Sequence, residues 1–190
     1  MEINPRILLL NDVEVRICRM PSQGRQRDNE RLYAQGLIDG IFNCHVKILH
    51  EQSGKPYLEG FPDEISISHT KGFVAVARNL QNPSVPVGVD IEYVSDRVLR
   101  VLEKFLTENE TALVEKKPWL PYRDFCLVAW CAKEAAYKKC GVQGVDFKEH
   151  FRISDISAAS VALAVSHPDI VESTICFRYL VTPGYVLVAG

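Results

Sequence analysis

Apolar residues recur along this chain with two different periods. Spacings of three and four positions predict long helices over about residues 23–43 and 122–140, the second closed by Gly141. A shorter apolar face over residues 98–105 predicts another helix, with Asp96 as its N-cap. Thr107 and Glu110 have capping-box spacing, so a further short helix is expected there.

Short apolar or alternating runs predict strands before the first long helix and after each of the two long helices. The first two runs flank Asn11-Asp12 and predict a hairpin. The expected strands are residues 7–10, 13–17, 46–49, 65–68, 73–77 and 87–92 in the first half, and 151–153, 161–165, 174–180 and 185–189 in the second. A helix followed by several strands therefore occurs twice.

This repeated order of elements predicts an α+β fold made of two similar modules. We expect each module to be a long helix packed on a small antiparallel sheet, with a pseudo-twofold axis relating the two. The predicted N-terminal module spans residues 1–95 and the C-terminal module residues 96–190. A ligand cleft is expected between the halves.

The composition of the 190 residues is ordinary for a globular protein. A formal net charge of -2 lacks the basic excess of a general nucleic-acid binder. No apolar run approaches the roughly 20 residues that cross a bilayer, and the first residues lack the pattern of a secretory signal. Six cysteines without a CxxC pair favour reduced thiols over a zinc or disulfide site, so we expect a cytoplasmic protein.

Two carboxylates lie two positions apart in the strand expected over residues 87–92. Alternation along a strand places Asp90 and Glu92 on one face, opposite the apolar side chains. Carboxylates this close repel each other unless a cation lies between them, and Mg²⁺ takes oxygen ligands of this kind. A solvated acidic face is the alternative interpretation. Gly88 suits a strand poorly and indicates that another group approaches the backbone closely.

The second long helix carries a row of functional side chains. A spacing of four places Trp130, Glu134 and Lys138 on one helix face. A carboxylate and a lysine one turn apart suit phosphoryl transfer, in which one accepts a proton and the other meets developing phosphate charge. A surface ion pair beside a packed tryptophan is the alternative. The two alanines after Glu134 allow another element to pack closely.

Basic and hydroxyl side chains lie at turns upstream of these two motifs. Ser68 and His69 end a predicted strand at a glycine-containing turn, where hydroxyl, amide and imidazole groups can converge on a phosphate. Lys55 extends from the rigid turn Gly54-Lys55-Pro56, and Arg31 lies on the first helix. Ordinary turn residues and solvated charges are the alternative interpretation of each.

Taken in order, these motifs resemble the 4′-phosphopantetheinyl transferase superfamily. The resemblance rests on Gly-Lys-Pro at 54–56, Ser-His-Thr at 68–70, GxDxE at 88–92 and WxxKEAxxK at 130–138. The length and the two modules resemble the Sfp-type members, which implies their two-module fold. The resemblance implies transfer of 4′-phosphopantetheine from coenzyme A to a serine of an apo acyl or peptidyl carrier protein. The second product would be adenosine 3′,5′-bisphosphate.

The resemblance also implies a role for each residue of the reaction centre. Asp90, Glu92 and Glu134 would hold Mg²⁺ against the pyrophosphate of coenzyme A. Glu134 would take the proton from the serine, or Glu92 would do so through a water on the metal. Lys138 would neutralise or protonate the leaving bisphosphate.

The upstream residues would bind coenzyme A. Ser68 and His69 would contact its phosphates, Lys55 would lie near its nucleotide end, and Arg31 would lie near its 3′-phosphate. The family usually carries several basic residues in this N-terminal segment, and Arg31 is the one that aligns convincingly.

Two other functions stay open at this point. One is a metal-dependent phosphotransferase with a different nucleotide substrate, and the other is a non-catalytic module that binds coenzyme A or docks a carrier protein. A fused two-module chain is expected to act as a monomer, without nucleic-acid or membrane partners. Val98, Leu102 and Phe105 are candidates for a carrier-docking surface, and burial in the core is the alternative.

Overall fold

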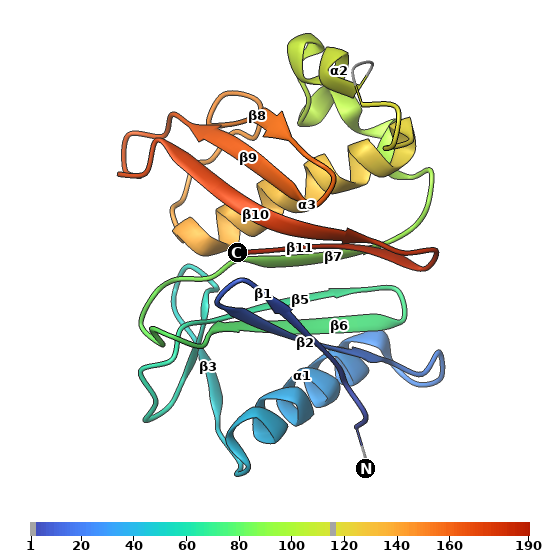
Figure 1. The fold of residues 1–190 in the computed structure, drawn as a ribbon. Coiled ribbons are helices and arrows are strands. Elements are labelled where there is room, and N and C mark those ends of the chain that lie inside the picture. Colours follow the sequence, from blue (N-terminus) through green and yellow to red (C-terminus); the bar gives the residue numbers. More distant parts are fainter. Residues whose placement is uncertain (1–2, 115–116) are drawn as a thin grey trace.

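The computed structural model describes residues 3–114 and 117–190 as two large antiparallel sheets, each covered by one long helix (Figure 1). The first sheet has the order β1 (Arg6–Leu10), β2 (Val13–Arg19), β6 (Phe73–Asn79) and β5 (Ile65–Thr70). The second sheet has the order β7 (Val89–Tyr93), β11 (Tyr185–Ala189), β10 (Thr174–Val181), β9 (Ser160–Val165) and β8 (Phe151–Ile156). A separate hairpin pairs β3 (Ile48–His50) with β4 (Pro56–Leu58).

The long helices lie where the apolar periodicity predicts them. They are α1 (Gln26–Phe42) and α3 (Tyr122–Cys140), and Gly141 ends α3 with a φ of 66°. The expected helix over residues 98–105 is instead two 3₁₀ turns, η1 (Val98–Arg100) and η2 (Leu102–Lys104). Of the helices in the described ranges, none has both the length and the apolar character to cross a membrane.

The capping box starts α2 (Glu108–Val114) as predicted. The Thr107 amide donates to the Glu110 carboxylate at 2.8 Å, and the Glu110 amide donates to the Thr107 hydroxyl at 3.3 Å. These reciprocal bonds satisfy amides that a helix start otherwise leaves unpaired.

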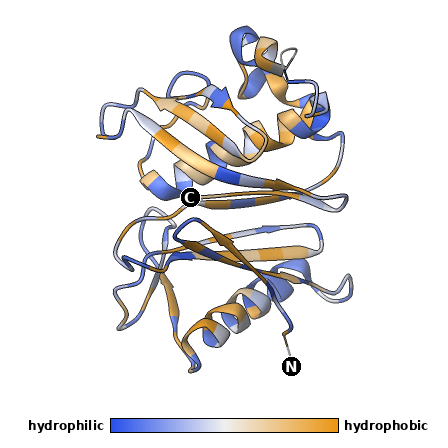
Figure 2. Cartoon of the chain, viewed as in Figure 1, coloured by the Kyte–Doolittle hydropathy of each residue, from blue (hydrophilic) through white to orange (hydrophobic). Residues whose placement is uncertain are grey.

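Three apolar clusters fill the spaces between the layers. One lies between α1 and the first sheet, one between the two sheets, and one between the second sheet and α3. The central strands are therefore buried on both faces: Ala75 of β6 faces the other sheet, and Val76 faces α1. Figure 2 shows hydrophobic segments along the strands of both sheets, and both hydrophobic and hydrophilic segments along the helices.

Strand β7 does not follow the predicted module boundary after residue 95. It pairs antiparallel with β11, so Asp90 lies opposite Val188 in the second sheet. The carboxylates assigned to the N-terminal module thus belong to the sheet of the C-terminal half. Local periodicity predicts that β7 is a strand, but its partner is set by the apolar face that it shares with β11 between the sheets. The pseudo-twofold relation of the modules stays a prediction.

Gly88 is the point at which β7 comes closest to α3. A β-carbon added there would lie 2.8 Å from the Ala135 carbonyl carbon and closer still to its oxygen. The group that the sequence expects near Gly88 is therefore the backbone of α3. Ala135 and Ala136 are fully buried at this contact, as their small size predicts.

Gly88→Ala should destabilise the protein by about 1–3 kcal/mol, because the added methyl meets backbone that cannot rotate away. Urea unfolding followed by circular dichroism measures the loss. Gly40→Ala is the matched control, since its added methyl meets only the tip of Arg16 at 3.5 Å within a helix. Equal stability of the Gly88 variant and the wild type would contradict this close contact.

Candidate active site

Strand β7 presents two carboxylates on the face opposite the core between the sheets. Val89 and Ile91 are buried in that core, so the predicted alternation is confirmed. Asp90 is 4% exposed, whereas Glu92 is only partly buried. The strand therefore holds one deeply buried and one more accessible carboxylate side by side.

Helix α3 brings Lys138 and Glu134 to the same place. The Lys138 ammonium donates to Asp90 Oδ1 at 2.7 Å and to the Val89 carbonyl at 3.2 Å. The second Asp90 oxygen, Oδ2, is buried and accepts no hydrogen bond from the part of the chain that the structure describes. An unsatisfied buried carboxylate oxygen is costly and needs a cationic or hydrogen-bonding partner.

Burial and mutual repulsion raise the pKa values of both remaining carboxyls. Burial raises the pKa of Glu134 to about 7, and the Asp90 charge adds to this effect. The pKa of Glu92 is raised by burial and then by Asp90, while Thr70 and Trp130 oppose the shift through hydrogen bonds. With all three carboxyls ionised, the cluster would carry more negative charge than Lys138 alone compensates, and the raised pKa values of Glu92 and Glu134 reflect this repulsion in addition to their burial.

These carboxylates have the chemistry of a magnesium site but are not gathered around one point. Across residues 3–114 and 117–190, no three His, Cys, Asp or Glu side chains are arranged to hold a metal together. The Lys138 ammonium is bound to Asp90 instead. Oxygen donors, excess negative charge and the unpartnered Asp90 Oδ2 all fit a hard divalent cation.

Two hydroxyls of β5 bind the carboxylates of β7. Ser68 donates to Asp90 Oδ1 at 2.7 Å, and Thr70 donates to Glu92 Oε2 at 2.9 Å. Ser68 is 4% exposed, so its hydroxyl is turned toward Asp90 and not toward solvent. The sequence assigns Ser68 to a phosphate and Thr70 to no role. The alternation of hydroxyls along β5 is the signal that could have revealed both contacts.

The basic residues predicted to bind coenzyme A line two adjoining cavities. Lys55 and Lys138 line one of about 190 Å³, and Arg31 and His69 line another of about 670 Å³. Both cavities share Gly54, Pro56 and Ile67 as walls. The structure therefore brings all four basic side chains to two cavities with shared walls, together called the groove, between α1, the β3–β4 hairpin and α3.

Acidic partners that the sequence reasoning missed hold two of these groups. Glu64 binds the Lys55 ammonium at 2.6 Å, and the buried Glu30 lies 3.2 Å from His69 Nδ1. Neither acid is near its partner in the sequence, so only the fold reveals these pairs. They fix the direction in which each basic side chain faces the groove.

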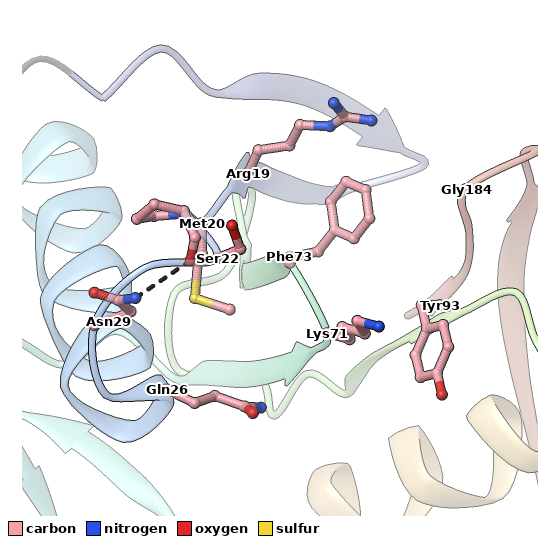
Figure 3. Close-up of a pocket in the computed structure, with 12 residues that line it drawn as sticks. Arg19, Met20, Ser22, Gln26, Asn29, Lys71, Phe73, Tyr93 and Gly184 are labelled. Carbon is pink, nitrogen blue, oxygen red and sulfur yellow. Dashed lines mark hydrogen bonds between the residues drawn. The ribbon is translucent and has the colours of Figure 1, made fainter.

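A third cavity, of about 580 Å³, lies between the first sheet, the start of α1 and Tyr93 (Figure 3). It is lined by Arg19 at the end of β2, by Lys71 in the turn between β5 and β6, and by Tyr93, which directly follows Glu92. The Lys71 ammonium lies 5.9 Å from the centre of the Tyr93 ring. Glu92 and Tyr93 also line a neighbouring cavity of about 290 Å³ together with Trp130. Glu92 thus borders an opening that is distinct from the basic groove.

Comparison with known proteins identifies the family. The model of the 4′-phosphopantetheinyl transferase superfamily matches residues 86–187, which is more than half of the chain. The chain belongs to this superfamily. The matched segment contains Asp90, Glu92, Glu134 and Lys138, whereas the groove residues of the first half lie outside it.

Curated relatives carry the same family name. The chain is 30% identical over 146 residues to the 4′-phosphopantetheinyl transferase ffp of Bacillus subtilis, which covers 74% of this chain and 60% of that protein. It is 28% identical over 129 residues to the 4′-phosphopantetheinyl transferase gsp of Aneurinibacillus migulanus, covering 67% and 52%. The chain spans about half the length of these relatives.

The carrier-docking surface predicted for this superfamily member is wrong at two of its three residues. Val98 is 7% exposed and Phe105 is fully buried. Phe105 packs edge-on against Trp130 at a centroid distance of 5.1 Å. The apolar side chains after Asp96 therefore serve the core around α3, which is the alternative that the sequence left open.

Proposed function

We propose that this protein transfers 4′-phosphopantetheine from coenzyme A to a serine of an apo acyl or peptidyl carrier protein. One observation carries the proposal: Asp90 is buried with one oxygen unpartnered, beside Lys138 and two carboxyls of raised pKa, within the family-matched segment. Such a cluster suits a phosphoryl group and the cation that accompanies it.

Coenzyme A would lie in the groove, where the basic side chains offset its phosphates. Arg31 and His69 line the wider cavity, where Arg31 would meet the 3′-phosphate and His69 would contact a phosphate of coenzyme A. Lys55 lines the cavity that also contains Lys138, so we move it from the nucleotide end toward the carboxylates. Lys138 lines the end nearest Asp90 and would meet the pyrophosphate. Because the Ser68 hydroxyl is buried against Asp90, we assign it to that carboxylate and no longer to a phosphate.

Asp90, Glu92 and Glu134 are the residues that would hold Mg²⁺. When bound, the ion supplies positive charge that lowers the repulsion between the pyrophosphate and an incoming nucleophile. Lys138, whose ammonium binds Asp90 Oδ1 and leaves Oδ2 unpartnered, would face the substrate phosphates beside this carboxylate.

The chain supplies the proton acceptor and the cation for the leaving group. The serine oxygen of the carrier forms a bond to the phosphorus that bears phosphopantetheine, and the bond to adenosine 3′,5′-bisphosphate breaks. Glu134 accepts the serine proton, for which a pKa of about 7 is well matched near neutral pH. Lys138 stabilises or protonates the departing phosphate.

The carrier protein would approach from the opening lined by Tyr93, the residue that follows Glu92 (Figure 3). Arg19 and Lys71 give this side basic character beside the carboxylates. One chain contributes every group named here, so the proposed enzyme acts as a monomer.

Intact-mass spectrometry of an apo carrier protein tests the proposal. Incubation with this protein, coenzyme A and Mg²⁺ should add the mass of one phosphopantetheine group, and EDTA should prevent the gain. Binding of coenzyme A without transfer to any of several carriers would favour a non-catalytic module. Transfer from a different nucleotide alone would favour another phosphotransferase.

Lys138→Ala should lower the turnover number by about 10²- to 10³-fold, because a cation that meets transition-state charge is lost. The affinity for coenzyme A should change much less, since the other groove residues remain. Transfer assays quenched at fixed times measure the turnover number, and calorimetry measures the affinity for coenzyme A. Lys139→Ala is the control, because Lys139 lines a different cavity. A fall in affinity alone would make Lys138 a binding group only.

A further inference from the structure

Three hydroxyl side chains form a buried row on β5. Ser66, Ser68 and Thr70 alternate along the strand and therefore share one face. Their exposed fractions are 3%, 4% and 7%. Strand β5 is an edge of the first sheet and β7 an edge of the second, and the two strands contact each other. We call these three residues the hydroxyl row.

The hydroxyl row replaces a neighbouring strand for β7. In an antiparallel ladder only alternate amides of a strand face its partner, so the others on β7 point away from β11. Each of these outward amides donates to one hydroxyl: Val89 to Ser66 at 3.0 Å, Ile91 to Ser68 at 3.2 Å and Tyr93 to Thr70 at 3.3 Å. The row thereby joins the two sheets at the active site.

Two members of the row also donate a hydrogen bond to a carboxylate. A hydroxyl that accepts from an amide still has one hydrogen to donate. Ser68 gives it to Asp90 Oδ1 at 2.7 Å, and Thr70 gives it to Glu92 Oε2 at 2.9 Å. In both cases the carboxylate belongs to the residue just before the amide donor. The same arrangement is therefore built twice, once for each carboxylate of β7.

Ser66 lacks the second half of this arrangement. The residue before Val89 is Gly88, which has no side chain that could accept a hydrogen bond from the Ser66 hydroxyl. Ser66 consequently ties the strands together without orienting a carboxylate. Ser66 therefore serves as an internal control, because it joins the two sheets but positions no carboxylate.

We propose that Ser68 and Thr70 are positioning residues that hold the Asp90 and Glu92 side chains in the orientation that binds a divalent cation. The proposal rests on the function proposed above. Each hydroxyl fixes one carboxylate oxygen, and Asp90 Oδ2 is left without a partner among the residues described. Partners that orient metal ligands typically change metal affinity by about 10–100-fold when removed.

Manganese binding followed by electron paramagnetic resonance of the free ion tests this role. Mn²⁺ is titrated into each protein with and without saturating coenzyme A. Thr70→Val keeps the shape but removes the hydroxyl, and should weaken binding by about 10–100-fold. Thr70→Ser keeps the hydroxyl and should bind almost as the wild type does. Ser68→Ala should weaken binding even without coenzyme A.

Ser66→Ala separates the positioning role from a merely structural one. Ser66→Ala removes one hydrogen bond between β5 and β7 and Thr70→Val removes two, so both variants should unfold at lower urea concentrations. Only the Thr70 variant should lose manganese affinity. Equal affinity in all variants, or an equal loss in Ser66→Ala, would overturn the positioning role. If the wild type binds no Mn²⁺ in either condition, the metal site itself falls, and the positioning role with it.

Discussion

Glu134→Gln should slow phosphopantetheine transfer by about 10²- to 10⁴-fold, the range expected when a positioned proton acceptor is removed. The amide has nearly the same size as the carboxyl group, so the packing of α3 against β7 is retained. It can neither accept the serine proton nor contribute negative charge toward a cation. Initial rates of mass gain on the carrier protein measure the effect.

The same variant should be more stable than the wild type at about pH 8 in EDTA, by on the order of 1–3 kcal/mol. The folded pKa of Glu134 is raised from 4.5 to about 7, so the folded state binds the proton more tightly than the unfolded state does. Its contribution to stability is present at low pH and is lost as the pH rises through that interval. Glutamine stays neutral and undergoes no such loss.

Urea unfolding of both proteins at acidic and alkaline pH separates these effects. Their stabilities should converge at low pH and diverge as the pH rises. Glu103→Gln is the control, because Glu103 is exposed on η2 and should alter neither stability nor transfer. A Glu134 variant that is less stable at alkaline pH, or one that transfers at the wild-type rate, would contradict the assignment.

Lys133→Met should destabilise the protein by about 3–5 kcal/mol, the cost of breaking a buried ion pair. The Lys133 side chain is 0% exposed, and its ammonium lies 2.6 Å from Glu110 Oε1. It also donates to the carbonyls of Phe105 at 2.5 Å and Phe147 at 3.1 Å. Methionine fills the space but leaves the Glu110 charge and two carbonyls without this donor.

A double-mutant cycle with Glu110→Gln measures how strongly the two groups are coupled. Lys104→Met is the control, since Lys104 is exposed and should be nearly neutral. Folded Lys133→Met protein should keep most of its turnover, because Lys133 points to the core and not to Glu134's side of the helix. Unchanged stability together with lost transfer would instead make Lys133 part of the chemistry.

Features with a local signal were predictable from the sequence. The helix over residues 122–140 and the capping box at Thr107 depend on near neighbours in the chain, and both are confirmed. Asp90 and Glu92 share a strand face because alternation is a property of the strand itself. Glu134 and Lys138 share a helix face for the same local reason, and the packing of α3 against β7 then brings Lys138 to Asp90.

Features set by distant contacts were not predictable. Lys133 lies in the same motif as Glu134, yet its burial depends on Glu110 and on two loops that no local pattern connects. The role of Thr70 depends on β5 lying against β7, two edges of different sheets. The sheet that β7 joins is likewise decided by β11, far along the chain.

The pairing of β7 with β11 also constrains how the protein is made. Residues 89–93 leave the ribosome long before residues 185–189, so β7 must wait for its partner during synthesis. Until then it is an unprotected strand edge, the kind of surface on which nascent chains aggregate. Asp90 and Glu92 place two charges on that waiting edge and oppose its pairing with another chain.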